Sequence, residues 1–217
     1  MPPDSHGRAA YLPAASTLVV ADLHVGQGAG TPSDRLVTAV EATSPDTVVF
    51  AGDILDRFGA PSARSVETVR ALASAVRAAD ARPVAVAGNH DGGLADAWPG
   101  PVHDAYRLDD STLVCHGHEA PDADAERYVC GHVHPALSVE GDKWDCFLWT
   151  PSGYRDRPTL VVPAFSSAAS GLRVEGREAV DSPLVSDLDS VRPGVVDGAE
   201  TRWFPRLEAL RSRLRRR

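Results

Sequence analysis

Five short runs of apolar residues recur along the first two thirds of the chain, and each of them ends in polar residues. Each run holds four to six apolar residues, rich in valine, in continuous rather than alternating order. A continuous apolar run of this length is typical of a strand that is covered on both faces. We therefore predict five buried strands, within residues 16–24, 46–53, 82–91, 111–118 and 127–134.

Segments of helical character separate the first three runs. Residues 33–42 begin with Ser33, a suitable helix cap, and residues 61–80 begin with Pro61, which fits a first helical turn. Both segments carry apolar residues at helical spacing. Alternation of strand and helix predicts a parallel sheet built by right-handed crossovers.

The pattern changes from about Val102, where shorter strands and turns follow one another. We predict a second, more antiparallel sheet stacked on the first, and a last helix after Pro205. The expected fold class is α/β, a four-layer α/β/β/α sandwich of two mixed β-sheets flanked by helices. A chain of 217 residues fits one domain, residues 1–217. The later strands are expected within residues 143–149, 159–165, 171–176 and 177–180.

Composition excludes several classes of protein. No stretch approaches the roughly 20 apolar residues that a membrane span needs, and residues 1–10 hold no apolar signal segment. Three cysteines without a CxxC pair argue against a disulfide framework and favour the cytoplasm. Cys115 and Cys130 lie inside apolar runs, where a thiol acts as a small hydrophobic side chain.

The net charge of −8 bears on which partners the chain can bind. Lys143 is the single lysine among mostly arginine cations, a composition that fits either adaptation to high salt or a GC-rich genome. An acidic surface repels nucleic acid unless a local feature reverses the field. The C-terminal arginines, residues 211–217, either grip phosphates or an acidic partner, or keep the end of a helix soluble.

Polar side chains at the ends of the five runs supply the candidate chemistry. The carboxyl ends of parallel strands open onto one edge of a sheet, so these side chains are expected to converge. Carboxylate, amide and imidazole ligands suit Mn, Fe, Co or Zn, and so many candidate ligands fit two ions that share a carboxylate better than one ion. The converging residues are Asp22, His24, Asp53, Asn89, His90, His116, His132 and His134.

The order of short motifs resembles the calcineurin-like metallophosphoesterase superfamily. Its elements D-x-H, G-D, G-N-H-D/E, H-G and G-H-x-H stand here in order as "DLH" at 22–24, "GD" at 52–53, "GNHD" at 88–91, "HG" at 116–117 and "GHVH" at 131–134. The stretches "ADLHVG", "GHVHPA" and "VPAFSSAASG" look like compact archaeal phosphoesterases related to SbcD and like bacterial DNA-ligase-associated phosphoesterases. The likeness runs from about Gly7 to Leu214.

The resemblance implies a set of roles. His90 would be the general acid, and Asp91 would either orient it or cap a loop. His132 and His134 would reach different ions from one side of an extended chain. The implied cofactors are two divalent ions, manganese first, with iron, zinc, cobalt and nickel as alternatives. One ion would be held by Asp22, His24, Asp53 and His134, and the other by Asp53, Asn89, His116 and His132.

The function implied is a metal-dependent phosphoesterase that hydrolyses phosphodiesters of the nucleotide or nucleic-acid type with a hydroxide activated by two metals. The alternatives are a phosphomonoesterase and a catalytically silent binding scaffold. Expected partners are a phosphate ester, including nucleotides or single-stranded nucleic acid, and no membrane. Three features stay open: Asp56 as a hydrogen-bond partner or a surface carboxylate, His118 as a cleft or loop residue, and residues 143–157 as a flap or dimer contact.

Overall fold

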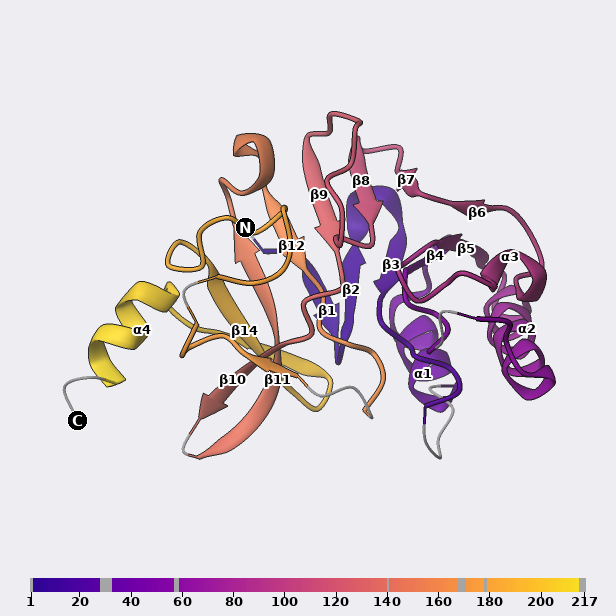
Figure 1. Ribbon diagram of the computed structural model, residues 1–217, viewed down its shortest axis with the longest axis horizontal. Helices are drawn as coiled ribbons and strands as arrows, with labels where there is room; N and C mark the ends of the chain where they lie inside the picture. The colour runs from indigo at the N-terminus through magenta and orange to yellow at the C-terminus, as the bar shows by residue number, and fades with distance from the viewer. Residues whose placement is uncertain are drawn as a thin grey trace.

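The computed structural model describes residues 2–27, 33–56, 59–139, 141–167, 171–177 and 179–214. Two β-sheets pack face to face in the middle of the molecule, with helices outside them (Figure 1). The predicted α/β sandwich of two mixed sheets flanked by helices is confirmed.

The first sheet has six strands in the order β1-β2-β3-β4-β5-β6. Strands β3, β4 and β5 are parallel and correspond to the first three predicted runs. The predicted crossover helices are α1 (Ser33–Thr43) and α2 (Ala63–Ala78), although α2 is capped by Ser62 and begins after Pro61. The antiparallel edge formed by β1 and β2 was not predicted. The strands are β1 (Asp4–His6), β2 (Ala9–Leu12), β3 (Thr17–Val20), β4 (Thr47–Ala51), β5 (Arg82–Val86) and β6 (Val102–His103), with α3 (Leu94–Ala97) before β6.

The second sheet runs in the order β13-β10-β11-β12-β9-β8-β7, and β14 and β15 extend it from β11. It mixes parallel pairs, such as β8 with β9, and antiparallel pairs, such as β10 with β11. The fourth and fifth predicted runs form β8 and β9. The strands are β7 (Ala105–Arg107), β8 (Thr112–Cys115), β9 (Arg127–Cys130), β10 (Pro135–Val139), β11 (Asp142–Thr150), β12 (Thr159–Val161), β13 (Leu172–Arg173), β14 (Arg192–Asp197) and β15 (Glu200–Trp203).

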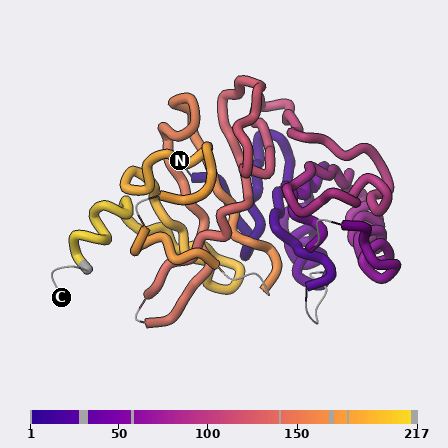
Figure 2. Tube along the Cα trace, viewed as in Figure 1, coloured from indigo at the N-terminus to yellow at the C-terminus, as the bar shows by residue number. Residues whose placement is uncertain are grey.

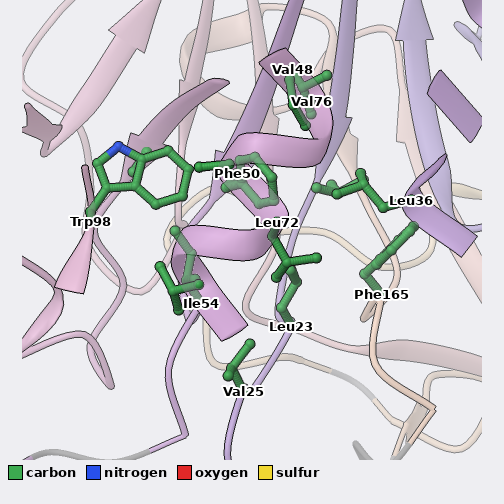
Figure 3. Packing of buried hydrophobic residues seen from close by; sticks show 14 of the residues in the cluster. Leu23, Val25, Leu36, Val48, Phe50, Ile54, Leu72, Val76, Trp98 and Phe165 are labelled. Carbon is green, nitrogen blue, oxygen red and sulfur yellow. The ribbon is translucent and has the colours of Figure 1, made fainter. Parts of the chain in front are cut away.

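Alternating residues of each central strand serve two different cores, which explains the continuous apolar runs. In β4, Val48 and Phe50 face α1 and α2, whereas Val49 and Ala51 face the second sheet. Figure 3 shows the first of these cores, where Phe50 lies beside Trp98 with ring centroids 5.2 Å apart. Both faces of these strands are therefore withdrawn from water, as the sequence predicts.

The outer face of the second sheet is covered by the C-terminal part of the chain. Leu184, Leu188 and Leu207 pack there against strand residues such as Tyr128 and Leu148. The predicted last helix is present as α4 (Leu207–Leu214). Arg211 donates hydrogen bonds to the carbonyl oxygens of Val174 and Glu175, so this arginine fastens α4 to the preceding segment. Positions 215–217, also part of the arginine cluster, lie outside the described residues.

The predicted strand at 177–180 is not formed by the residues described there, and Glu178 lies outside them. The short stretch carries two charged residues before its apolar pair. In the described part of the chain, none of the helices has the length and apolar character needed to cross a membrane.

The three cysteines are free and buried, so the expectation of no disulfide framework is confirmed. Burial raises the pKa of the Cys115 thiol to about 12 and that of Cys130 well above its usual range. These thiols stay protonated and pack as small hydrophobic groups, because a thiolate in an apolar core loses its hydration.

The two sheets share one rim, which follows from the directions of their strands. The chain leaves β3, β4 and β5 at this rim, and in the second sheet it leaves β8, β9 and β12 there. The two sets of ends are joined directly: Ala21 bridges Ala164, and the Nδ1 atom of His116 lies 3.1 Å from the carbonyl oxygen of Ala51. Figure 2 shows the purple helical segments of the first half of the chain on the right and the yellow C-terminal segment on the left, with salmon segments of the second sheet reaching the centre.

Candidate metal centre

The side chains that close the five predicted strands meet at this shared rim. The structure therefore brings together residues that are far apart in the sequence, such as Asp22 and His132, which are 110 positions apart. Each of these residues lies in a loop, no more than four residues after the end of a strand. Asp22 and His24 follow β3, Asp53 follows β4, Asn89 and His90 follow β5, His116 follows β8, and His132 and His134 follow β9.

One group of ligand atoms consists of Asp22, His24 and His134. The Nε2 atom of His134 lies 3.2 Å from Oδ1 of Asp22 and 3.3 Å from Nε2 of His24. Their ligand atoms all lie within 4.8 Å of one another. Two sheets contribute to this group, because His134 comes from the second and the other two residues from the first.

A second group consists of Asp53, His116 and His132. The Nε2 atom of His116 lies 3.3 Å from Oδ2 of Asp53 and 3.1 Å from Oδ1 of Asn89. Asn89 thus adds an amide oxygen to this group. Each group brings together three of the four residues that the family resemblance assigns to one ion.

Asp53 lies between the two groups. It also forms a cluster with His24 and His90, whose Nε2 atom is 4.0 Å from Oδ2 of Asp53. The backbone N–H of His90 donates a hydrogen bond to the other carboxylate oxygen, Oδ1, at 2.9 Å. Asp53 therefore has ligand atoms of both groups within reach, as a shared carboxylate requires.

The donor set fits divalent cations because its negative charge is buried and poorly compensated. Asp22 is fully buried and Asp53 is 2% exposed. Among the described residues, neither carboxylate has an arginine or lysine within ion-pair distance; their charged contacts are histidines. Within the same part of the chain, the buried Nδ1 atom of His24 has no hydrogen-bond partner. Buried carboxylates are costly unless a cation neutralises them, and a cation here would meet a ready set of oxygen and nitrogen ligands.

The pKa shifts of Asp53, His24 and His132 favour the protonation states that bind metal ions, whereas that of His116 favours its charged form. Burial by itself would raise the pKa of Asp53, but the hydrogen bond and charge of His116 and the N–H of His90 lower it to about 2. Burial lowers the pKa of His24 and of His132. Burial also acts to lower the pKa of His116, yet its contacts with Asp53 and Asp22 raise it overall. Ionised carboxylates and neutral imidazoles are the forms that bind metal ions.

Five of the candidate ligands adopt left-handed backbone conformations, which are costly for residues other than glycine. Hydrogen bonds between the loops hold this strained geometry: the N–H of Asp22 donates to Gly52, and the N–H of His24 donates to Asp53, both at 3.0 Å. Strain of this kind concentrates at functional sites. The φ angles are 56° for Asp22, 48° for His24, 47° for Asp53, 68° for His132 and 46° for His134.

The extended chain predicted at His132 and His134 is wrong. Strand β9 ends at Cys130, and residues 131–134 form turns in which the N–H of Val133 bonds to the carbonyl oxygen of Gly131. The N–H of His132 instead donates to both carboxylate oxygens of Asp22, at 3.0 and 3.2 Å. Side-chain hydrogen bonding therefore replaces the sheet ladder and turns the two histidines toward different groups.

Three glycines allow the loops to approach this closely. A Cβ atom on Gly52 would lie 2.4 Å from Nδ1 of His116, and one on Gly131 would lie 2.6 Å from Oδ2 of Asp22. At Gly88 the same atom would lie 2.2 Å from Oδ1 of Asp53. The glycines of the "GD", "GNHD" and "GHVH" motifs are thus required by the approach of the ligands themselves.

Asp91 caps a loop, which was one of its two predicted roles. Its buried carboxylate accepts hydrogen bonds from the N–H groups of Leu55 at 2.8 Å, Gly88 at 2.9 Å and Ile54 at 3.3 Å. It therefore ties the loop after β4 to the loop after β5. Burial raises the pKa of Asp91 to about 6, against the effect of these donors.

Replacing Asp91 with asparagine is expected to lower the free energy of unfolding by about 2 kcal/mol, because the new amide group would face backbone N–H donors. Urea denaturation of the chelated protein measures this loss. The exposed Asp96 gives a matched control, since its change to asparagine should stay within about 0.5 kcal/mol of the parent protein. Equal stability of both variants would contradict the capping role.

Two residues whose roles the sequence leaves open, Asp56 and His118, lie beside the candidate metal centre. Oδ1 of Asp56 is 3.6 Å from Nδ1 of His24, so this carboxylate is a neighbour of the first group rather than a distant surface residue. The ring of His118 lies 5.3 Å from that of His116 and 6.1 Å from that of His132, and burial lowers its pKa. Both contribute to the wall around the ligands.

The sequence did not reveal two arginines that hold the loop at residues 164–166, which contacts Asp22. Arg8 donates to the carbonyl oxygens of Ala164 and Ser166, and Arg35 donates to that of Phe165. The N–H of Ser166 in turn donates to the carbonyl oxygen of Asp22 at 3.2 Å. An isolated arginine in a turn or on a helix gives no sequence signal for such a long-range role.

Comparison with known proteins places this geometry in context. The calcineurin-like phosphoesterase family matches residues 15–144. The fold is similar to that of the nuclease MPE from Pseudomonas putida, with a TM-score of 0.64 and 22% identity over 91% of each chain. YfcE, a phosphoesterase from E. coli, gives a TM-score of 0.46 and 16% identity over 83% of this chain and 87% of its own.

A Vps29 variant from Entamoeba histolytica gives a TM-score of 0.41 and 16% identity over 87% of this chain and 99% of its own. No curated protein matches the sequence significantly. At these identities, the similarity to the nuclease is a similarity of fold.

Proposed function

The chain belongs to the calcineurin-like phosphoesterase family, and from that membership we propose that it hydrolyses phosphodiesters of the nucleotide or nucleic-acid type with two divalent metal ions. The observation that carries the proposal is the pair of ligand groups at one rim, with Asp53 between them. Manganese is the first candidate metal, and iron, zinc, cobalt and nickel are alternatives that the same oxygen and nitrogen ligands accept.

The proposed assignment follows the two groups. Asp22, His24 and His134 would hold one ion, and Asn89, His116 and His132 the other, with Asp53 shared. Two such ions, held by these residues, would supply positive charge for the phosphate oxygens and would lower the pKa of a bound water to about neutrality. This local charge would reverse the repulsion between the acidic protein and an anionic substrate.

His90 is the proposed proton donor to the leaving oxygen. Its side chain is 28% exposed and lies next to the shared carboxylate, so it borders the centre while remaining open to a substrate. The N–H of the same residue is anchored on Asp53, which fixes the position of the ring relative to the ligands. A group in this position can protonate an alkoxide as the ester bond breaks.

The proposed preference for phosphodiesters rests on similarity to other proteins. The "VPAFSSAASG" stretch looks like phosphoesterases related to SbcD, and the similar fold from Pseudomonas putida is that of a nuclease. Neither likeness transfers an activity by itself, and the substrate class is therefore part of the proposal.

Hydrolysis of bis-p-nitrophenyl phosphate with added manganese, before and after chelation, tests the proposed function. We expect activity that chelation removes and manganese restores. Faster hydrolysis of p-nitrophenyl phosphate would make the protein a phosphomonoesterase instead. Metal binding without hydrolysis of either ester would favour the silent scaffold.

Replacing His90 with asparagine is expected to slow hydrolysis of a dinucleotide by about 10²–10⁴-fold and that of bis-p-nitrophenyl phosphate much less. The reason is that a nitrophenolate leaves without a proton, whereas a sugar alkoxide does not. The ratio of kcat on the two substrates measures the effect, with metal content determined alongside. His103, which packs against Tyr106 outside the centre, gives the control variant. An equal loss on both substrates would remove the acid role.

A further inference from the structure

A cleft opens on the same rim as the metal centre. Its volume is about 550 Å³, and its lining includes Arg8, Arg35, Thr38, Lys143, Trp144 and Asp145. We call it the basic cleft. None of these residues belongs to the candidate ligands, and the proposed hydrolysis at the metal centre does not use them.

The topology places the basic cleft beside the metal centre. Arg8 precedes β2, which pairs antiparallel with β3, so this arginine lies at the end of β3 that carries Asp22. In the second sheet, Lys143 and Asp145 are at the start of β11, which runs antiparallel to β12 and is two strands away from β9. Two strand spacings amount to about 10 Å. The cleft and the centre are therefore neighbours along one rim.

A short loop forms a common wall between them. Arg8 and Arg35 donate to the three successive carbonyl oxygens of residues 164–166. On the other side of the chain, the N–H of Phe165 donates to Ala21 at 2.8 Å and that of Ser166 to Asp22. The two arginines are fixed by these contacts, so their charges line the cleft without the entropy cost of ordering long side chains.

The charge of the cleft is opposite to that of the protein. Three cationic side chains face one carboxylate, Asp145, which is ion-paired with Arg8. The single lysine of a chain with a net charge of −8 is one of the three. Lys143 is exposed and makes a 3.4 Å hydrogen bond to the carbonyl oxygen of Gly171. The local field therefore attracts an anion that the rest of the surface repels.

We propose that the basic cleft binds the backbone of a single-stranded nucleic acid whose neighbouring phosphodiester lies at the metal centre. This inference rests on the proposed function and narrows its substrate class from small nucleotides to a strand. The common wall at residues 164–166 keeps the cleft close enough to the metal centre for one strand to contact both. A positively charged groove that follows the backbone is the usual means of binding a single strand without reading its sequence.

The shape and charge favour one strand over a duplex. The cleft is lined by the tip of the β1–β2 hairpin, α1 and the start of β11, and the chain as a whole has a net charge of −8. A duplex presents a wide, rigid array of phosphates, most of which would lie outside the cleft and be repelled by the net negative charge of the protein. A single strand can place its phosphates in the cleft and keep clear of the rest.

Charge reversal at Lys143 tests the inference. Binding of a fluorescent phosphorothioate oligothymidylate to the manganese-loaded protein is measured by anisotropy at several salt concentrations. Lys143→Glu is expected to weaken binding about tenfold and to reduce the slope of log K against log salt by about 0.7. Thr38→Arg, which adds a cation at the exposed rim of the cleft, is expected to strengthen binding about threefold.

Arg157→Glu is the matched control. It changes the net charge by the same amount, but Arg157 lies in another cleft and pairs with Glu126 on the surface. We expect its affinity to stay within about twofold of the parent protein. Equal weakening by both reversals, no weakening by Lys143→Glu, or equal competition by duplex DNA would overturn the inference.

The outcome is separable from that of the proposed function. Hydrolysis of bis-p-nitrophenyl phosphate by the parent protein reports on the metal centre, whereas the affinity pattern of the variants reports on the basic cleft. Hydrolysis with no effect of Lys143→Glu on binding would leave the function and remove the cleft. Weaker binding by Lys143→Glu without hydrolysis by the parent protein would support nucleic-acid binding at the cleft and contradict the proposed hydrolysis.

Discussion

Replacing Asp53 with asparagine is expected to remove both metal ions and to lower kcat/KM on bis-p-nitrophenyl phosphate by at least about a thousandfold. The carboxylate lies between the two ligand groups, so a neutral amide in its place weakens both at once. Charge stabilisation by bound metal is worth several kcal/mol, and each 1.4 kcal/mol is a factor of ten in rate. Elemental analysis and steady-state kinetics measure the two effects.

The substitution is mild for the fold, since the Oδ1 atom of an asparagine can still accept the hydrogen bond from the N–H of His90. Asp110 supplies the control: it is 14% exposed, pairs with Arg127 away from the centre, and should tolerate the same change. A protein that keeps two ions per chain after Asp53→Asn would contradict the shared role.

Replacing Gly88 with alanine is expected to lower the free energy of unfolding by about 3 kcal/mol and to abolish most metal binding. The added Cβ would lie 2.2 Å from Oδ1 and 2.3 Å from the backbone nitrogen of Asp53, contacts that require the loops to separate. Thermal unfolding with and without manganese measures both effects, because bound metal raises the unfolding temperature only if the ligands still converge.

Gly176 is the matched control, because a Cβ there meets nothing within 4 Å. We expect Gly176→Ala to leave metal binding unchanged and stability within about 0.5 kcal/mol. If Gly88→Ala behaved in the same way, the close approach of the two loops would not be a requirement of the centre.

The central strands and the residues that follow them could be predicted because both depend on local patterns. A strand with two buried faces must be apolar throughout, as in β4, and it must end where polar residues begin. Since parallel strands end at one edge, the sequence positions of Asp22, Asp53 and Asn89 already implied their proximity. The motif order then grouped the histidines of the second sheet with them.

Edge strands and pairings within the second half could not be predicted in the same way. β1 has a polar sequence and is three residues long, and β14 contains Pro193 and Gly194, which are typical of turns. These segments form strands because β2 and β11 present free edges to them. Long-range pairing, rather than local preference, decides their conformation.

The geometry of the ligand loops also exceeded what the sequence showed. A histidine pair separated by one residue fits an extended chain, but the N–H of His132 bonds to Asp22, which lies 110 residues earlier. The same holds for Asp91, whose partners Ile54 and Leu55 belong to another loop. Interactions of this kind exist only once both sheets are in place.

Because the candidate ligands come from both sheets, we expect metal loading to depend on assembly of the sandwich. Under the proposed assignment, one ion would be bound by Asp22 and His24 from the first sheet and by His134 from the second, and would therefore cross-link the two halves of the sandwich. Neither half alone would supply all of these ligands, so loading would follow docking of the sheets. Metal supply would then select against misassembled chains, because only a correctly closed sandwich retains its ions.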